Sequence, residues 1–322
     1  MVKPSASLNL EIPEQGTELD PAEARHPHGL AVLAVLLAAT CWSLIGVAYR
    51  LILDEFDVSP LTLISFRTST AALAMMIYVM LRPTLRGQIR GVRSRGQVIP
   101  LLGAGMLSIT GFNIALIYTF EVAGVAVGTV LLYFAPSIVA LGSWLAFKHR
   151  ITRVQCIALG LSLCGVVGVS GVITGGETFQ VAGIALGILA ATGYASYSLV
   201  GQFLLTRYHP LVVVAMSQSV GALTAWTVKL VVDGTSIPGF TAIAWMVGVT
   251  GILTTLVPMV LYTWGLSKLG PPRASLLTTI EPVLAVGLAF IVLNETLTVY
   301  QLGGGTLVIG SVVLAASERV RR

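Results

Sequence analysis

The stretch LAVLAVLLAATCWSLIGVAYRLI, from Leu30 to Ile52, holds a single charged residue, Arg50. About 20 apolar residues are enough to cross the ~30 Å hydrocarbon core of a bilayer as a helix. Similar runs recur along the chain, in which 55% of the residues are hydrophobic and only 10% are Asp, Glu, Lys or Arg. This composition leaves too little polar surface to coat a soluble globule. The sequence therefore predicts an all-α integral membrane protein.

The apolar runs predict ten transmembrane helices with short connections. The predicted spans are 30–52, 59–81, 98–120, 124–147, 153–173, 180–205, 211–232, 240–266, 272–293 and 298–316. The gap from Arg82 to Gly96 is the longest between helices and leaves no room for an inserted soluble domain. Residues 1–28 are acidic with scattered Pro and Gly, a composition that predicts a disordered cytoplasmic tail.

Lys and Arg gather in the loops on one side of the predicted membrane domain. The clusters are Arg82–Arg95, Lys148–Arg153, Arg207, Lys268–Arg273 and Arg319–Arg322. Because Lys- and Arg-rich loops stay in the cytoplasm, we expect both termini to be cytoplasmic. The net charge of +5 is then a topology signal. Nucleic acid is not an expected partner, since its binding needs a clustered basic face on a water-exposed domain.

The ten predicted helices look like two copies of five. Leu37–Thr40 recurs as Leu189–Thr192. Further on, Gly124, Pro136, Thr152 and Gln155 match Gly270, Pro282, Thr298 and Gln301 at one constant offset. Five is odd, so the two copies must enter the membrane in opposite orientations, as in many secondary transporters. The sequence thus predicts inverted five-helix repeats at residues 29–173 and 180–317.

The stretch RASLLTTIEPV, from Arg273 to Val283, is followed by Asn294-Glu295-Thr296 and a Gly-rich last helix. Together with Arg67 in the second span, these residues resemble the EamA-type branch of the drug/metabolite transporter superfamily. The resemblance implies ten helices, both termini inside, a location in the inner (plasma) membrane, and export of amino acids or similar metabolites. Exporters of aromatic amino acids and of threonine and homoserine are similar. The first copy departs from the family's pattern, with Ala135-Pro136 in place of Glu-Pro.

Two ionisable residues are predicted deep in the bilayer: Arg67, about eight residues into its span, and Glu281, about nine residues into its own. A charge at a helix centre costs at least ~2.5 kcal/mol and is seldom kept without use. One of the two could bind a substrate carboxylate and the other an ammonium group or a coupling proton. Alternatively, Glu281 could bond backbone groups freed by Pro282, and Arg67 could pair with carbonyls or with Glu281.

Three prolines, Pro136, Pro258 and Pro282, fall inside predicted helices, where they are expected to act as hinges or kinks. Polar and aromatic residues near them could line a small-molecule pocket. These candidates are Asn113, Tyr118, Tyr133, Tyr262, Thr278 and Thr279, with Trp42 and Tyr194 from matching parts of the first and sixth spans. Ordinary packing or an interfacial aromatic belt is the alternative for any one of the aromatic residues.

Most glycines are better explained by close helix contact than by ligand binding, among them Gly165, Gly168 and the run Gly303–Gly305. That run lacks the Gly-Lys-Ser/Thr of a phosphate loop. The three cysteines have no metal-binding spacing. No cofactor, metal or catalytic residue is therefore expected, and an intramembrane enzyme is disfavoured because no nucleophile and base have the needed spacing.

The sequence predicts a secondary transporter that exports small neutral or zwitterionic metabolites, with amino acids the first choice. Transport would proceed by alternating access at a midplane site between the inverted repeats. The expected partners are a small-molecule substrate, the lipid bilayer and a coupling proton. A passive channel or facilitator for small solutes, built on the same helices, is the alternative.

Overall fold

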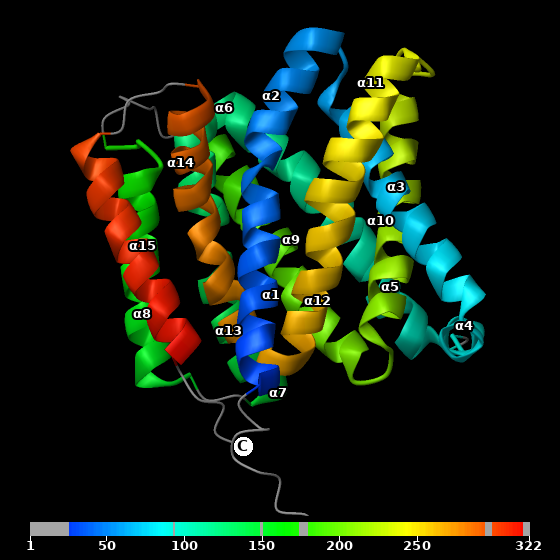
Figure 1. Ribbon diagram of the computed structural model, residues 1–322, viewed down its shortest axis with the longest axis horizontal. Coiled ribbons are helices and arrows are strands. Elements are labelled where there is room, and N and C mark those ends of the chain that lie inside the picture. Colours follow the sequence, from blue (N-terminus) through cyan, green and yellow to red (C-terminus); the bar gives the residue numbers. More distant parts are fainter. Residues whose placement is uncertain (1–25, 93, 149–150, 174–179, 294–297, 318–322) are drawn as a thin grey trace, which may run out of the picture.

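The computed structural model describes residues 26–92, 94–148, 151–173, 180–293 and 298–317, and every regular element in these ranges is a helix. In chain order the elements are α1 (His26–Ser43), α2 (Ile45–Phe56), α3 (Pro60–Leu81), α4 (Pro83–Arg90), α5 (Arg95–Gly105), η1 (Met106–Gly111), α6 (Phe112–Leu132), α7 (Ala135–Phe147), α8 (Arg153–Val169), α9 (Val181–Leu205), α10 (Pro210–Val232), α11 (Phe240–Trp245), η2 (Met246–Leu256), α12 (Val257–Leu269), α13 (Pro271–Leu277), η3 (Thr278–Ile280), α14 (Glu281–Leu293) and α15 (Val299–Ser317). The long helices form one bundle, with the start of α1 and the end of α15 at the same end (Figure 1).

Eight helical segments in the described ranges are long and apolar enough to cross a membrane. They are Gly29–Tyr49, Pro60–Leu81, Arg95–Gly124, Val127–Phe147, Val181–Leu205, Pro210–Val232, Phe240–Leu269 and Val299–Ser317. Of the ten predicted spans, the fifth forms a shorter apolar helix of 17 residues, α8. The ninth is divided by the 3₁₀ turn η3. The chain is therefore a multi-pass membrane protein.

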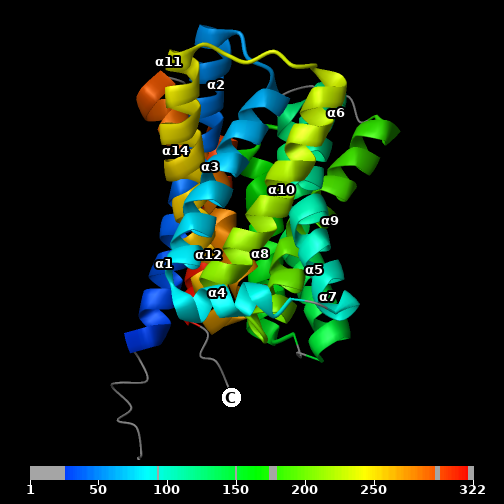
Figure 2. The ribbon, with the colours of Figure 1, turned by 90° about the vertical axis from the view of Figure 1, so that its right-hand side faces the viewer.

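Three predicted boundaries differ from the structure. α1 begins at His26, so the last three residues of the predicted tail 1–28 are helical, while residues 1–25 lie outside the described ranges. The first predicted span is divided at Leu44 into α1 and α2. The predicted connection from Arg82 to Gly96 contains a further short helix, α4. Figure 2 shows α4 lying across the end of the bundle rather than along it.

Local sequence signals account for several helix ends, and matching positions in the two halves share them. Thr152 and Gln155 form a reciprocal capping box at the start of α8, and Thr298 and Gln301 make the same hydrogen bonds at the start of α15. Gly124 has φ 81° and ψ 159°, and Gly270 has φ 77° and ψ 164°. Glycine is required at such a positive φ, so both sites break the helix at the same point of the sequence pattern.

The helices pack in a small number of close pairs. α3 lies along α10, α8 along α15, α6 along α9 and α1 along α12, while α3 also contacts η2. Figure 1 shows α8 and α15 side by side at one flank of the bundle. At the other flank Lys229, fully buried at the end of α10, donates to the backbone carbonyls of Gly234 and Ser236. These two bonds fix the loop between α10 and α11.

Glycines at the crossing of α8 and α15 confirm the predicted close contact. A Cβ atom added to Gly165 would lie 2.7 Å from the carbonyl oxygen of Gly304, and one added to Gly168 would lie 2.9 Å from the Gly304 Cα. The prediction is wrong for Gly303, around which a Cβ atom would meet nothing within 4 Å. Successive residues lie on different faces of a helix, so Gly303 faces away from α8 while Gly304 faces it.

Candidate functional site

The three prolines predicted to lie inside helices all stand at the second position of an α-helical segment. Pro136 follows the turn that ends α6, Pro258 follows the π-helical segment η2, and Pro282 follows η3. Proline is tolerated in the first turn of a helix because its missing N–H would have no partner there. The prolines therefore mark breaks in three long spans rather than strain within a continuous helix.

Glu281 lies at the break between α13 and α14, where it opens α14 directly after η3. Its side chain is partly exposed and accepts a hydrogen bond from the hydroxyl of Tyr133, a buried residue at the end of α6. Tyr194 of α9 lies within electrostatic reach of the same carboxylate and shares a hydrogen bond with Thr278. Three parts of the chain that are distant in sequence thus meet at Glu281.

An aromatic cluster continues from Tyr194, which lies within electrostatic reach of both Glu281 and Tyr262. The ring centroids of Trp42 on α1 and Tyr262 on α12 are 5.4 Å apart, and those of Tyr197 and Tyr262 are 6.0 Å apart. The hydroxyl of Tyr262 is 2.6 Å from Ser198 Oγ, and that of Tyr197 is 2.6 Å from Thr263 Oγ1. Aromatic rings with hydrogen-bonded hydroxyls therefore pack together between α1, α9 and α12.

Arg67 forms a second polar centre, on α3. It is buried, and its guanidinium donates to the hydroxyl of Tyr49 and to Oδ1 of Asn113, each at 3.0 Å. The Asn113 amide in turn donates to the carbonyl of Ile109, inside the π-helical segment η1, at 2.6 Å. π-Helical turns are frequent at functional sites because they shift side chains out of the regular helical register. Pairing of Arg67 with Glu281, one of the alternatives left open by the sequence, is not observed.

Adjacent residues connect the two centres. Phe112 packs against Tyr194, with ring centroids 5.4 Å apart, and its neighbour Asn113 binds Arg67. Nε of Arg67 is buried and has no hydrogen-bond partner among the described residues. Neighbouring residues at the start of α6 thus contact both centres, and the guanidinium keeps one donor without a partner among the described residues.

Not all of the candidate residues belong to this region. Thr279 is buried and donates to the carbonyl of Leu276 in its own turn. Tyr118 is 44% exposed and lines a different cavity of about 140 Å³ together with Ser59, Glu121 and Asp233. In the described ranges, no group of three or more His, Cys, Asp or Glu side chains is placed to hold a metal ion.

Sequence reasoning missed Tyr49, Phe112 and Ser198 as members of the two centres. Ser198 lies four residues after Tyr194 on α9, so a helical-face argument could have found it. Tyr49 lies on α2, beyond the break at Leu44, and the nearby Gly46 is too weak a signal by itself to predict that break.

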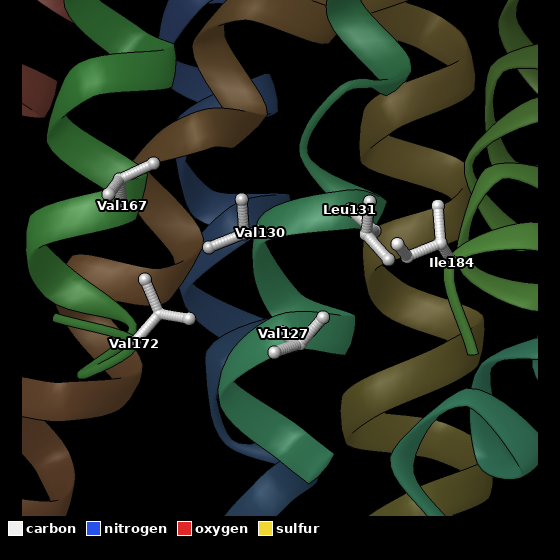
Figure 3. A pocket seen from close by; sticks show the side chains of 6 residues that line it. All are labelled: Val127, Val130, Leu131, Val167, Val172 and Ile184. Carbon is white, nitrogen blue, oxygen red and sulfur yellow. The ribbon is translucent and has the colours of Figure 1, made fainter. Parts of the chain in front are cut away.

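An apolar cavity of about 310 Å³ lies between α6, α8 and α9 (Figure 3). Its walls are the aliphatic side chains of Val127, Val130, Leu131, Val167, Val172 and Ile184. With no polar side chain in its lining, this cavity offers no group that could orient a polar ligand.

Comparisons with known proteins agree with this architecture. The sequence matches the model of the EamA-like transporter family over residues 29–171 and 181–317. It is 26% identical over 297 residues to a Salmonella typhimurium protein described as "Uncharacterized inner membrane transporter YicL", covering 90% of this chain and 96% of that one. It is 27% identical over 241 residues to the Synechocystis protein "Uncharacterized transporter sll1319", covering 72% and 71%.

A solved structure titled "Crystal structure of protein" has the same fold, with a TM-score of 0.72 at 19% sequence identity over 88% of this chain and 96% of that one. Its likeness concerns the fold alone, whereas the family match covers both halves of the sequence. The chain belongs to the EamA-like transporter family of the drug/metabolite transporter superfamily, and it is a transporter rather than an enzyme.

Proposed function

We propose that this protein is a secondary transporter that exports small neutral or zwitterionic metabolites, with amino acids the first choice, by alternating access. The observation that carries this proposal is the position of Glu281 at a helix break, hydrogen-bonded to Tyr133 from the other half of the chain and within electrostatic reach of Tyr194. Secondary transporters commonly bind their substrates at such discontinuous helices near the membrane midplane.

The chemistry of the two centres suits a zwitterion. A carboxylate beside aromatic faces attracts an ammonium group through both charge and the quadrupole of the rings. Arg67, with an unpartnered Nε, is the matching group for a carboxylate. The candidate contacts are therefore Glu281, Tyr133, Tyr194, Tyr262 and Trp42 at one end, and Arg67 with Asn113 at the other. A doubly charged phosphate would need several cationic groups, which this region does not offer among the described residues.

Ten spans in two inverted repeats are part of the proposal, with α8 and the divided segment α13–α14 as the two additional spans. Matching conformations at Gly124 and Gly270 support it, as do the two capping boxes. Reciprocal packing between the two halves also supports the inverted repeats. Gly105 packs against Val220 on α10, while Gly251, at the same offset as the Gly124–Gly270 pair, packs against Thr70 on α3. Each half thus contributes the same close contact to the other.

The two halves differ at matched positions, which supports alternating access. Val127, Val130 and Leu131 border the apolar cavity of Figure 3. The positions at the same offset in the second half, Arg273, Leu276 and Leu277, are buried, and Arg273 Nη2 donates to the carbonyl of Ala316 on α15. One half thus borders an apolar cavity at positions where the other half is fully packed. In an inverted pair, exchanging these two arrangements would close one membrane side and open the other.

Transport by the purified protein tests the proposal. Proteoliposomes of controlled orientation would be screened with radiolabelled amino acids under an imposed pH gradient. We expect accumulation of at least one amino acid above its equilibrium level, and loss of that accumulation on adding a protonophore. Equilibration without accumulation would favour a facilitator, and absence of flux for every amino acid tested would refute the proposed substrate class.

A further inference from the structure

The short helix α4 is firmly attached to the end of the bundle. Its residues Leu85 and Ile89 pack against a cluster that includes Val79 of α3 and Val212 of α10. The side-chain oxygen of Gln88 accepts a hydrogen bond of 2.8 Å from the backbone N–H of His209. Figure 2 shows that α4 lies crosswise to the long helices. Its other faces are therefore presented outward in a fixed orientation at the edge of the membrane domain.

Arginines occupy the outward part of this helix. Arg86 and Arg90 lie four residues apart on α4, beside the inward-facing Leu85 and Ile89, and Arg82 is the extended residue directly before the helix. We call these three arginines the strip. Arg82 and Arg90 are exposed and Arg86 is partly exposed. The Arg82 guanidinium carbon lies 5.4 Å from the centre of the Tyr78 ring, which holds this side chain in place.

No acidic residue lies nearby in sequence to neutralise the strip. The chain contains no Asp or Glu from Val58 to Phe120 or from Thr178 to Val232. These two stretches supply α3, α4, α5, α9 and α10, the helices at this corner of the bundle. Two more exposed arginines, Arg95 and Arg207, lie at helix ends in the same stretches and add to the positive charge. The counter-charge must therefore come from outside these helices, either from a separate molecule or from the acidic segment 1–25.

The position of the strip indicates which molecule this is. Arg82 follows Leu81, which is 75% exposed, and stacks on Tyr78, which is 40% exposed. Ile99, near the start of α5, is 64% exposed. Apolar side chains this exposed on spanning helices face lipid, so the arginines lie where the hydrocarbon meets the headgroups. Guanidinium groups bind phosphate with two parallel hydrogen bonds.

We propose that Arg82, Arg86 and Arg90 form a binding surface for anionic phospholipid headgroups, with the lipid phosphate held along α4. The surface is independent of what the protein transports. Juxtamembrane basic residues favour an anionic bilayer surface by roughly fivefold each. Three of them predict an affinity for anionic over neutral lipid higher by on the order of a hundredfold.

The test uses the purified full-length protein in mild detergent and counts bound lipids by native mass spectrometry, comparing phosphatidylglycerol with phosphatidylcholine. The variant is Arg82→Gln/Arg86→Gln/Arg90→Gln. The charge-matched control is Lys148→Gln/Arg153→Gln/Lys268→Gln, which removes three exposed cations at the same end of the bundle. We expect phosphatidylglycerol binding to fall by on the order of a hundredfold in the first variant and by less than about threefold in the control.

Equal losses in the two triple variants would mean a diffuse charge effect and would overturn the proposal, as would equal binding of both lipids by the wild type. The acidic segment 1–25 is the competing occupant, so a third variant neutralises its five carboxylates. Tenfold tighter lipid binding by that variant would assign the surface to this segment instead. If the first variant does not fold, wild-type protein is crosslinked to photoactivatable phosphatidylglycerol. Adducts within residues 82–95 are expected, and adducts spread over all the loops would refute the site.

Discussion

Replacing Gly304 by alanine probes the contact that joins α8 to α15. An added Cβ atom would lie 2.5 Å from the carbonyl oxygen of Gly165 and 2.7 Å from the backbone nitrogen of Val169. Both atoms belong to the backbone of α8, so no side-chain rotation can relieve the overlap. The two helices would have to separate, and overpacking of this kind costs about 1–3 kcal/mol.

Alanine is also a better helix former than glycine, by up to about 1 kcal/mol, which offsets part of this loss. We therefore expect Gly304→Ala to lose about 1–2 kcal/mol of stability. The neighbouring substitution Gly303→Ala is the matched control. The added Cβ atom would meet nothing within 4 Å, so the Gly303→Ala protein should gain stability from the higher helix propensity of alanine without a steric clash.

The measurement is thermal unfolding of the purified proteins in one detergent, followed by thiol-reactive or tryptophan fluorescence. The order expected is Gly303→Ala at or above wild type, with Gly304→Ala several degrees below it. A Gly304→Ala protein that melts with the wild type would mean that α8 and α15 do not approach as closely as described, and would refute this reasoning.

Three further predictions concern other parts of the molecule. Pro136→Ala and Pro282→Ala should each fold and insert yet transport more slowly, because the breaks before α7 and α14 would become more regular; wild-type flux in both would make the prolines incidental. Lys229→Met should lower the unfolding temperature, because the carbonyls of Gly234 and Ser236 lose hydrogen bonds to a charged donor, worth about 1.5–3 kcal/mol; an unchanged melting curve would contradict that role. Single cysteines at Ser94 and Gly176, in a background without native cysteines, should react with an impermeant reagent from opposite sides of the membrane; labelling of both from outside would overturn the predicted topology.

Hydropathy and local signals predicted most of the helices from the sequence. The spans were readable because length and apolar composition are properties of consecutive residues. The capping pair Thr152 and Gln155 and the break at Gly124 were also visible, since caps and positive φ values depend on residue type at a fixed position. Arg67 does lie within a segment long and apolar enough to span a membrane, whereas Glu281 opens α14, which is not among the eight such segments, so its depth stays a prediction.

What the sequence could not give was the direction in which each side chain points across the bundle. Arg67 and Glu281 were both expected near the midplane, but their partners, Asn113 and Tyr133, depend on how helices distant in sequence are rotated against each other. Tyr118 was grouped with the site by sequence proximity and instead faces a separate cavity. The π-helical segments around these residues carry no local sequence signal, so the register shift that they introduce was not predictable.

We propose further that Glu281 carries the coupling proton at the substrate site, while the aromatic rings beside it hold the substrate's ammonium group well enough for exchange to continue without the charge of Glu281. Glu281→Gln keeps the shape and hydrogen-bonding capacity of the side chain and removes its change of charge. With a substrate identified by the screen above, two fluxes are measured in the same proteoliposomes: substrate exchange at equal pH, and uphill accumulation driven by a pH gradient. Arg67→Gln serves as the comparison, in which weaker substrate affinity with a retained pH response is expected. The account predicts that Glu281→Gln keeps exchange and loses accumulation. Unchanged pH-driven accumulation by Glu281→Gln, at equal protein level, would contradict it.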